Sequence, residues 1–156
     1  MRSDRLAKRH DMDRGGIIYF AYGSNMSPAQ MESRCPGGQA LGQAALHDWR
    51  FLINTRTYAT IEAEPGAMTY GVLWSLTEEH IDSLDIYEAV DEGMYYKDTL
   101  TVLHQGQPVE ALVYIDPVCE HGQPRPDYLR GILHGARHFE LPQDYVKMIA
   151  QDWGSA

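Results

Sequence analysis

The sequence has few cysteines, few basic residues and no long apolar run, and each shortage excludes a class of protein. Two cysteines, Cys35 and Cys119, occur among 156 residues, which excludes a disulfide scaffold and predicts free thiols in a reducing compartment, the cytoplasm. The 13 Lys and Arg residues stand against 22 Asp and Glu residues, a net charge of −9. Such a chain lacks the basic surface that nucleic acids or anionic membranes require. No apolar run approaches the roughly 20 residues of a membrane-spanning helix.

The length fits a single domain, and no repeat or linker divides it. Residues 1–16 carry five basic and three acidic residues, a charge of +2, which leaves −11 for residues 17–156. Because this segment has no apolar core, it is not a secretory signal. We therefore predict a disordered leader over 1–16 and one domain over 17–156. The partner expected for such a domain is a small molecule or another protein.

Short apolar or alternating runs predict strands, and capping residues predict where helices begin. Turn residues at Glu64-Pro65-Gly66 separate two of the predicted strands. Strands are predicted over 17–22, 43–53, 58–61, 68–76, 97–103 and 109–115. Helices are predicted to begin at Ser27, Thr77, Asp127 and Pro142. Since strands fill the middle and helices gather at the end, the order favours an α+β fold with an antiparallel or mixed sheet that could close into a small barrel.

The first candidate site is the loop Tyr22-Gly23-Ser24-Asn25, which joins the first strand to the first helix. A glycine lets the backbone approach a ligand closely, and successive N–H groups can hold an anion or a polarised carbonyl. The bland alternative is a routine strand-to-helix turn. Ser24 is not expected to be a hydrolase nucleophile, because the Gly-x-Ser-x-Gly arrangement is absent.

The second candidate is Glu88, within an acidic stretch over 78–92 that holds seven carboxylates and no Lys or Arg. Crowding and burial both raise the proton affinity of a carboxylate, which suits a general acid/base near neutral pH. The alternative is a solvated acidic helix face. Glu88 differs from its neighbours because Tyr87, Ala89 and Val90 flank it and suit a partly buried site.

Histidines and cysteines offer weaker candidates. His134 and His138 have the four-residue spacing of two ligands on a helix, but no third ligand is evident, so solvated histidines are the favoured interpretation. Neither Cys35 nor Cys119 has a local group that would activate a thiolate. The ten tyrosines are many for this length, and most such residues lie at core edges with a hydrated hydroxyl.

Two segments carry a resemblance to a known family. Tyr-Phe-Ala-Tyr-Gly-Ser-Asn-Met over 19–26, together with Leu-Asp-Ile-Tyr-Glu-Ala-Val over 84–90, resembles the γ-glutamylcyclotransferase family. Gly71–Trp74 is similar to a middle strand of that family, and Pro126–Tyr145 is similar to its C-terminal helices. Each motif alone is weak, but the ordered set extends over nearly the whole predicted domain.

The resemblance implies a small mixed β-barrel with flanking helices and no cofactor or metal. It implies cleavage of a γ-glutamyl amide by the substrate's own α-amine, with release of 5-oxoproline and a free amine. The family's general base falls on Glu88, and a further substrate-contacting tyrosine falls on Tyr114. The family's substrate loop falls on Tyr19, Phe20, Ala21, Tyr22, Gly23, Ser24 and Asn25.

The chain departs from the family pattern at two positions. Ala89 stands where the family has glycine, and Met26 stands where it has leucine. The added methyl group of Ala89 could narrow the pocket, but neither change removes a reactive group. The chemistry agrees with the residues, because an attacking substrate amine needs a carboxylate to accept its proton and N–H donors for the developing oxyanion.

Several alternatives stay open from the sequence. The amine released could belong to an amino acid, to a glutathione-like peptide, to γ-glutamyl-lysine or to a protected metabolite, although Tyr-Gly-Ser-Asn modestly favours γ-glutamyl amino acids. A non-catalytic member that binds a metabolite, or an interaction module using the acidic 78–92 face, would differ in class. The oligomeric state is also open, with a homodimer as one option.

Overall fold

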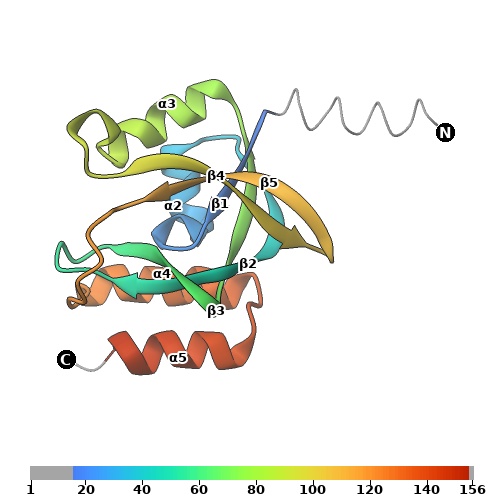
Figure 1. Cartoon of the computed structure of the whole chain (residues 1–156). Coiled ribbons are helices and arrows are strands. Elements are labelled where there is room, and N and C mark those ends of the chain that lie inside the picture. The colour runs from blue at the N-terminus through green and yellow to red at the C-terminus, as the bar shows by residue number, and fades with distance from the viewer. Residues whose placement is uncertain (1–15, 155–156) are drawn as a thin grey trace.

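The computed structural model describes residues 16–154, so the predicted leader lies outside the described residues except for Gly16. Figure 1 shows a barrel of strands with helices packed around it. The strands are β1 (Ile17–Ala21), β2 (Gln39–Ile53), β3 (Ala59–Leu76), β4 (Tyr96–His104) and β5 (Gln107–Ile115). The helices are α2 (Pro28–Arg34), α3 (Glu78–Tyr87), α4 (Pro126–His138) and α5 (Gln143–Trp153), with short 3-10 turns η1 (Ser24–Met26) and η2 (Val90–Glu92).

The five strands close into a barrel in the order β1-β3-β2-β4-β5. All neighbouring pairs are antiparallel except β1 and β5, which run parallel and complete the closure at Tyr19 and Leu112. The prediction of an α+β fold with a mixed barrel is therefore confirmed. Closure leaves no open edge for β1, and it fixes the end of β1 beside β5, where Tyr114 lies.

The prediction of two separate strands over 58–61 and 68–76 is wrong, because β3 is one strand through both. The turn residues form a bulge instead: His47 pairs with Met68 and Trp49 with Ala63, so four residues of β3 lie opposite Asp48 alone. The N–H of Gly66 donates to Oδ1 of Asp48 at 2.9 Å. Turn chemistry therefore bends a continuous strand without ending it, as bulges do in curved sheets.

The helix α3 is fixed at its first turn. The Thr77 hydroxyl accepts from the N–H of His80 at 3.2 Å, and Nδ1 of His80 accepts from the N–H of Thr77 at 3.1 Å. Nε2 of His80 therefore carries the ring proton and donates to the carbonyl of Pro36 at 2.7 Å. The predicted cap at Thr77 is confirmed, and the same box ties α3 to the segment that follows α2.

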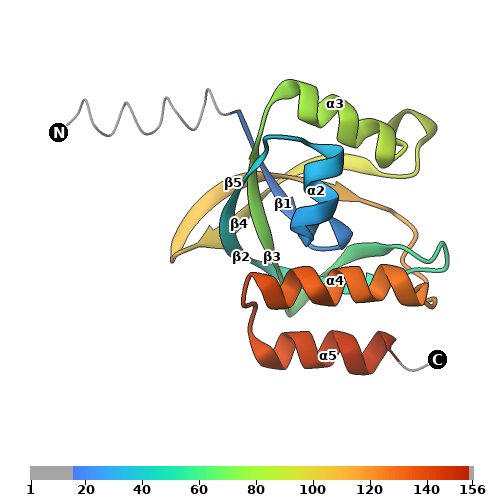
Figure 2. The same cartoon turned by 180° about the vertical axis from the view of Figure 1, so that it is seen from behind.

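The helices α4 and α5 form two layers beside the barrel, with α5 on the outer side of α4 in both views (Figures 1 and 2). The inner face of α4 buries Leu129, Ile132, Leu133 and Ala136. Among residues 16–154, no helix is long and apolar enough to cross a membrane.

Gly135 lets α4 approach η1 at backbone distance. A Cβ at Gly135 would lie 2.7 Å from the carbonyl carbon of Met26 and 2.8 Å from the nitrogen of Ser27. Real Cβ atoms do not come this close to backbone, so any side chain here displaces the turn that follows β1. One turn earlier in α4, a Cβ at Gly131 would meet nothing within 4 Å.

We therefore expect opposite effects from two Gly→Ala changes in one helix. Gly135→Ala should destabilise the protein by about 1–3 kcal/mol through overpacking. Gly131→Ala should stabilise it by about 0.5–1 kcal/mol, since alanine loses less backbone entropy in a helix. Thermal unfolding of both variants checks this, and equal effects would contradict direct backbone contact between α4 and η1.

Candidate active site

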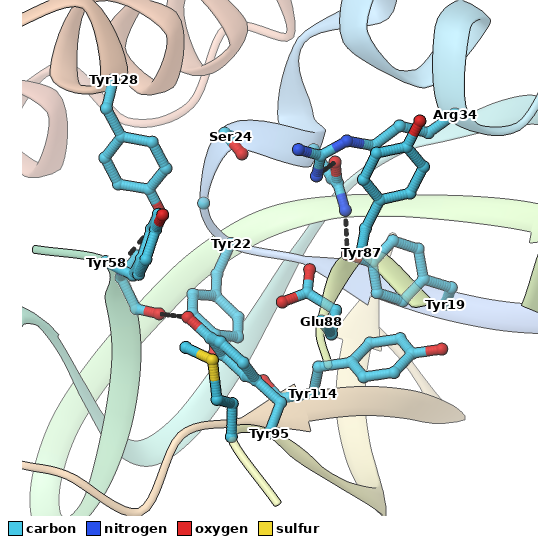
Figure 3. A pocket seen from close by; sticks show the side chains of 14 residues that line it. Tyr19, Tyr22, Ser24, Arg34, Tyr58, Tyr87, Glu88, Tyr95, Tyr114 and Tyr128 are labelled. Carbon is cyan, nitrogen blue, oxygen red and sulfur yellow. Dashed lines mark hydrogen bonds between the residues drawn. The ribbon is translucent and has the colours of Figure 1, made fainter. Parts of the chain in front are cut away.

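A pocket of about 200 Å³ opens where β1 ends and α3 ends. Its wall is rich in tyrosine and carries one carboxyl group and one guanidinium group. Figure 3 shows the Glu88 carboxyl pointing into this space, with tyrosine rings around it and Arg34 reaching across from α2. The lining residues are Tyr19, Tyr22, Gly23, Ser24, Asn25, Arg34, Tyr58, Ala59, Tyr87, Glu88, Met94, Tyr95, Tyr114 and Tyr128.

Most of the site residues expected from the sequence meet in this pocket. Tyr19 from β1, the loop residues Tyr22, Gly23, Ser24 and Asn25, Glu88 at the end of α3 and Tyr114 from β5 all line it. Phe20 and Ala21 do not; they are 0% and 1% exposed and pack in the core. Successive residues of a strand point to opposite faces, so Phe20 is directed away from Tyr19, and Ala21 packs among buried side chains.

Asn25 holds the loop in place through its side-chain amide, which is almost fully buried. Its Oδ1 accepts from Nε2 of Gln30 at 2.9 Å and from Nη1 of Arg34 at 3.0 Å. Its Nδ2 donates to the Tyr19 hydroxyl at 3.0 Å. Nε2 of Gln30 also contacts the Ser24 hydroxyl at 2.5 Å. One amide thus joins β1, η1 and α2 around the pocket.

Glu88 is the C-cap residue of α3 and lies half-buried in the pocket wall. Burial raises the pKa of its carboxyl to about 7; nearby Arg34 lowers this pKa and Asp116 raises it. The sequence suggested two causes, crowding by the acids of 78–92 and burial. Burial is the main cause, as expected, but the acidic contributor is Asp116, directly after β5, and not an acid of 78–92.

The tyrosine hydroxyls divide into two groups. Burial raises the pKa of Tyr19, Tyr22, Tyr95, Tyr114 and Tyr128, so all five stay protonated at neutral pH. The Tyr22 hydroxyl donates to the carbonyl of Tyr114 at 2.5 Å, and the Tyr95 hydroxyl donates to the carbonyl of Ala59 at 2.7 Å. The Tyr114 hydroxyl donates to Oδ1 of Asp85 at 2.7 Å.

Tyr19 and Tyr128 instead accept, from the Asn25 amide at 3.0 Å and from the N–H of Ala59 at 2.9 Å. Within residues 16–154, neither of these two hydroxyls donates to a protein acceptor. Tyr19 and Tyr128 therefore have a donor hydrogen left for a ligand in the pocket, whereas the hydroxyl of Tyr114 is committed to Asp85.

Sequence reasoning missed Arg34, Tyr58 and Tyr128 as parts of the pocket. For Arg34 a signal existed: Gln30 and Arg34 are four residues apart, so they share the helix face that meets Asn25. Tyr58 and Tyr128 come from the β2–β3 connection and from α4, and their rings meet edge-to-face at 5.6 Å. No local pattern brings those two segments together.

The weaker candidates stay apart from the pocket. His134 and His138 are exposed, with ring centroids 6.4 Å apart. Among residues 16–154, no group of three or more His, Cys, Asp or Glu side chains is placed to hold a metal ion. Burial raises the pKa of the Cys35 thiol to about 11, which disfavours the thiolate. Cys119 is not part of the pocket wall.

Comparison with known proteins identifies the family to which the chain belongs. Residues 68–149 match the AIG2-like family, which covers more than half of the chain. A gamma-glutamylcyclotransferase from Homo sapiens is 31% identical over 148 residues, or 88% of this chain and 79% of the human protein. The protein of that name from Mus musculus is 31% identical over 144 residues, or 85% and 77% of the two chains.

A solved structure of a gamma-glutamyl cyclotransferase has a TM-score of 0.80 and 29% identity over 85% of each chain. Its likeness agrees with the closed mixed barrel described above. The chain belongs to the γ-glutamylcyclotransferase family, and it is an enzyme of that class. The family resemblance predicted from the sequence is confirmed.

Ala89, the residue after Glu88, adopts the left-handed conformation with φ 50° and ψ 47°. This conformation costs a residue with a Cβ roughly 1–2 kcal/mol and costs glycine nothing. Ala89 is not among the residues of the pocket wall, so its methyl group does not narrow the pocket as the sequence suggested. The departure from glycine affects backbone strain rather than access.

We expect Ala89→Gly to stabilise the protein by about 0.5–1 kcal/mol, because relief of strain exceeds the entropy gained by the unfolded chain. Thermal unfolding should show a rise in Tm of roughly 1–4 °C. Ala29→Gly, at an exposed position in α2, is the matched control and should lower Tm. A lower Tm for Ala89→Gly would contradict the strain argument.

The raised pKa of Glu88 also makes a stability prediction. Its pKa rises from 4.5 to about 7 on folding, so the protonated form stabilises the fold below pH 4.5, and this contribution is lost as pH rises through 7. Glu88→Gln should therefore gain stability over the natural chain between pH 5 and pH 8, by roughly 1–3 kcal/mol for this partly exposed group. Urea unfolding at pH 5 and pH 8 tests it, with Glu92→Gln, at an exposed position four residues further on, as the matched control.

Proposed function

We propose that the protein cleaves a γ-glutamyl amide and releases 5-oxoproline and a free amine. The α-amine of the γ-glutamyl group attacks its own γ-carbonyl carbon, so a new C–N bond closes the five-membered ring. The amide bond to the leaving amine then breaks. The ring closure is intramolecular, and holding the chain in a folded conformation is a large part of the catalysis.

Glu88 is the proposed general base. Its carboxylate accepts the proton that the α-amine loses on attack and passes one to the leaving nitrogen. A pKa of about 7 suits both transfers at neutral pH. The observation that carries this proposal is that Glu88 shares one pocket with the Gly23–Asn25 loop. The loop backbone begins η1, and the first N–H groups of such a turn lack helical acceptors and can stabilise the oxyanion.

Substrate positioning is proposed for Tyr19, Ser24 and Tyr128. The hydroxyls of Tyr19 and Tyr128 have donor hydrogens free for a ligand, and Ser24 lies on the same wall. Tyr114 contributes its ring, which packs edge-to-face on Tyr19 at 5.7 Å, rather than its hydroxyl. We propose a reducing compartment such as the cytoplasm as the setting, which both cysteines support by being free thiols.

The test is release of 5-oxoproline from γ-glutamyl-alanine by the purified protein. Glu88→Gln keeps the size of the side chain but removes the base, so kcat should fall by about 10²–10⁴-fold. Glu92→Gln, an exposed acid four residues further on, should keep full activity. If Glu88→Gln retained more than a tenth of the natural kcat, Glu88 would not be the base. If the natural chain bound γ-glutamyl compounds without turning them over, the catalytic proposal itself would be wrong.

A further inference from the structure

Among residues 16–154, Arg34 contributes the single positive charge on the pocket wall. It is the last residue of α2 and is half-buried. Within residues 16–154, no carboxylate lies within 4.0 Å of its guanidinium group, although four other ion pairs form elsewhere in the protein. A charge partly removed from water and left without an acidic partner is costly, which indicates that its partner is a ligand.

The guanidinium group is held by two neutral contacts. Nη1 donates to Oδ1 of Asn25 at 3.0 Å, and the group lies over the ring of Tyr87 at 4.4 Å from the centroid. Figure 3 shows the side chain extended beside Tyr87 and above Glu88. Stacking and one hydrogen bond fix its plane and leave its other N–H donors for a planar anion such as a carboxylate.

The position of Arg34 indicates which part of a substrate it meets. The Tyr87 ring on which it stacks is 54% exposed, so Arg34 lies at the open side of the pocket. The α-amine of a γ-glutamyl substrate must lie at Glu88, whose carboxyl points into the pocket (Figure 3). The amine that leaves is at the other end of the scissile bond and extends toward the opening, where Arg34 is.

We propose that Arg34 is a specificity-determining residue that binds the carboxylate of the amino acid released from the γ-glutamyl group. This rests on the proposed function and adds a reason for preferring amino acids as leaving groups over simple amines. No covalent step involves Arg34. Its role is a charge-assisted, two-point hydrogen bond that a leaving group without a carboxylate cannot accept.

Two substrates that differ at one group test the proposal: γ-glutamyl-alanine and γ-glutamyl-alaninamide. The natural chain should favour the acid. Arg34→Gln should lower kcat/KM for the acid by about 10- to 100-fold and for the amide by less than about threefold. Arg34→Lys should keep part of the preference, since lysine keeps the charge but loses the planar fork. Arg130→Gln, an exposed arginine on α4, is the control and should change neither substrate.

Equal losses on the two substrates would overturn the proposal. They would mean that Arg34 acts on the glutamyl part of the substrate, on the pKa of Glu88 or on the fold. Melting temperatures of the variants separate the last case. A pH profile of kcat/KM with γ-glutamyl-alaninamide identifies an effect on Glu88, because loss of Arg34 would raise the pKa of Glu88 and move that limb of the profile to higher pH.

Binding measurements test the role of Arg34 even if the protein does not turn γ-glutamyl compounds over. Calorimetry measures the Kd of each compound for Glu88→Gln and for the double variant Glu88→Gln/Arg34→Gln, neither of which needs turnover. A preference for the acid that disappears in the double variant supports the role of Arg34. An unchanged preference, or none in either protein, overturns it.

Discussion

The side-chain amide of Asn25 is the contact on which the pocket depends. It accepts hydrogen bonds from Gln30 and Arg34 of α2 and donates to Tyr19 of β1. Because the amide is buried, leaving its oxygen or its NH₂ group without any partner would cost about 1–3 kcal/mol. The loop between β1 and α2 therefore has one favoured geometry, and α4 presses on it from behind at Gly135. The pocket is thus preorganised by packing and by polar contacts together.

Glu88 and Arg34 share this pocket without forming an ion pair. A close pair would hold the pKa of Glu88 low and occupy the guanidinium, and neither group could then act on a ligand. Here burial dominates the pKa of Glu88, and Arg34 only moderates the rise. Arg34 is held instead by the Asn25 amide and the Tyr87 ring. Keeping the charges apart leaves the carboxylate able to exchange a proton and the guanidinium able to bind an anion.

The parts of the fold that were predictable are those that local chemistry determines. Ser27 and Thr77 mark helix starts by capping, and the Glu88 segment follows from a helix end with apolar flanks. What failed depends on distant partners: Pro65 and Gly66 signal a turn, yet continued pairing with β2 keeps β3 intact. Tyr128 reaches the pocket because α4 packs on η1, where its ring meets that of Tyr58 from the β2–β3 connection, and no local pattern encodes these contacts. Burial as the cause of the raised pKa of Glu88 was expected from its apolar flanks, whereas the contribution of Asp116 follows only from the assembled barrel.

Charge acts on this enzyme locally rather than through its overall field. Residues 17–156 carry −11. The proposed substrate, a γ-glutamyl amino acid, has two carboxylates and one ammonium group, so the long-range field opposes its binding. At physiological ionic strength that field is screened beyond about 8 Å, and the acids of α3 and η2 are exposed to solvent apart from Asp85. Inside the pocket water screens less, so one guanidinium and a few N–H and O–H donors outweigh many surface carboxylates. The acidic surface repels anions only weakly, so the few N–H and O–H donors of the pocket determine which ligand binds.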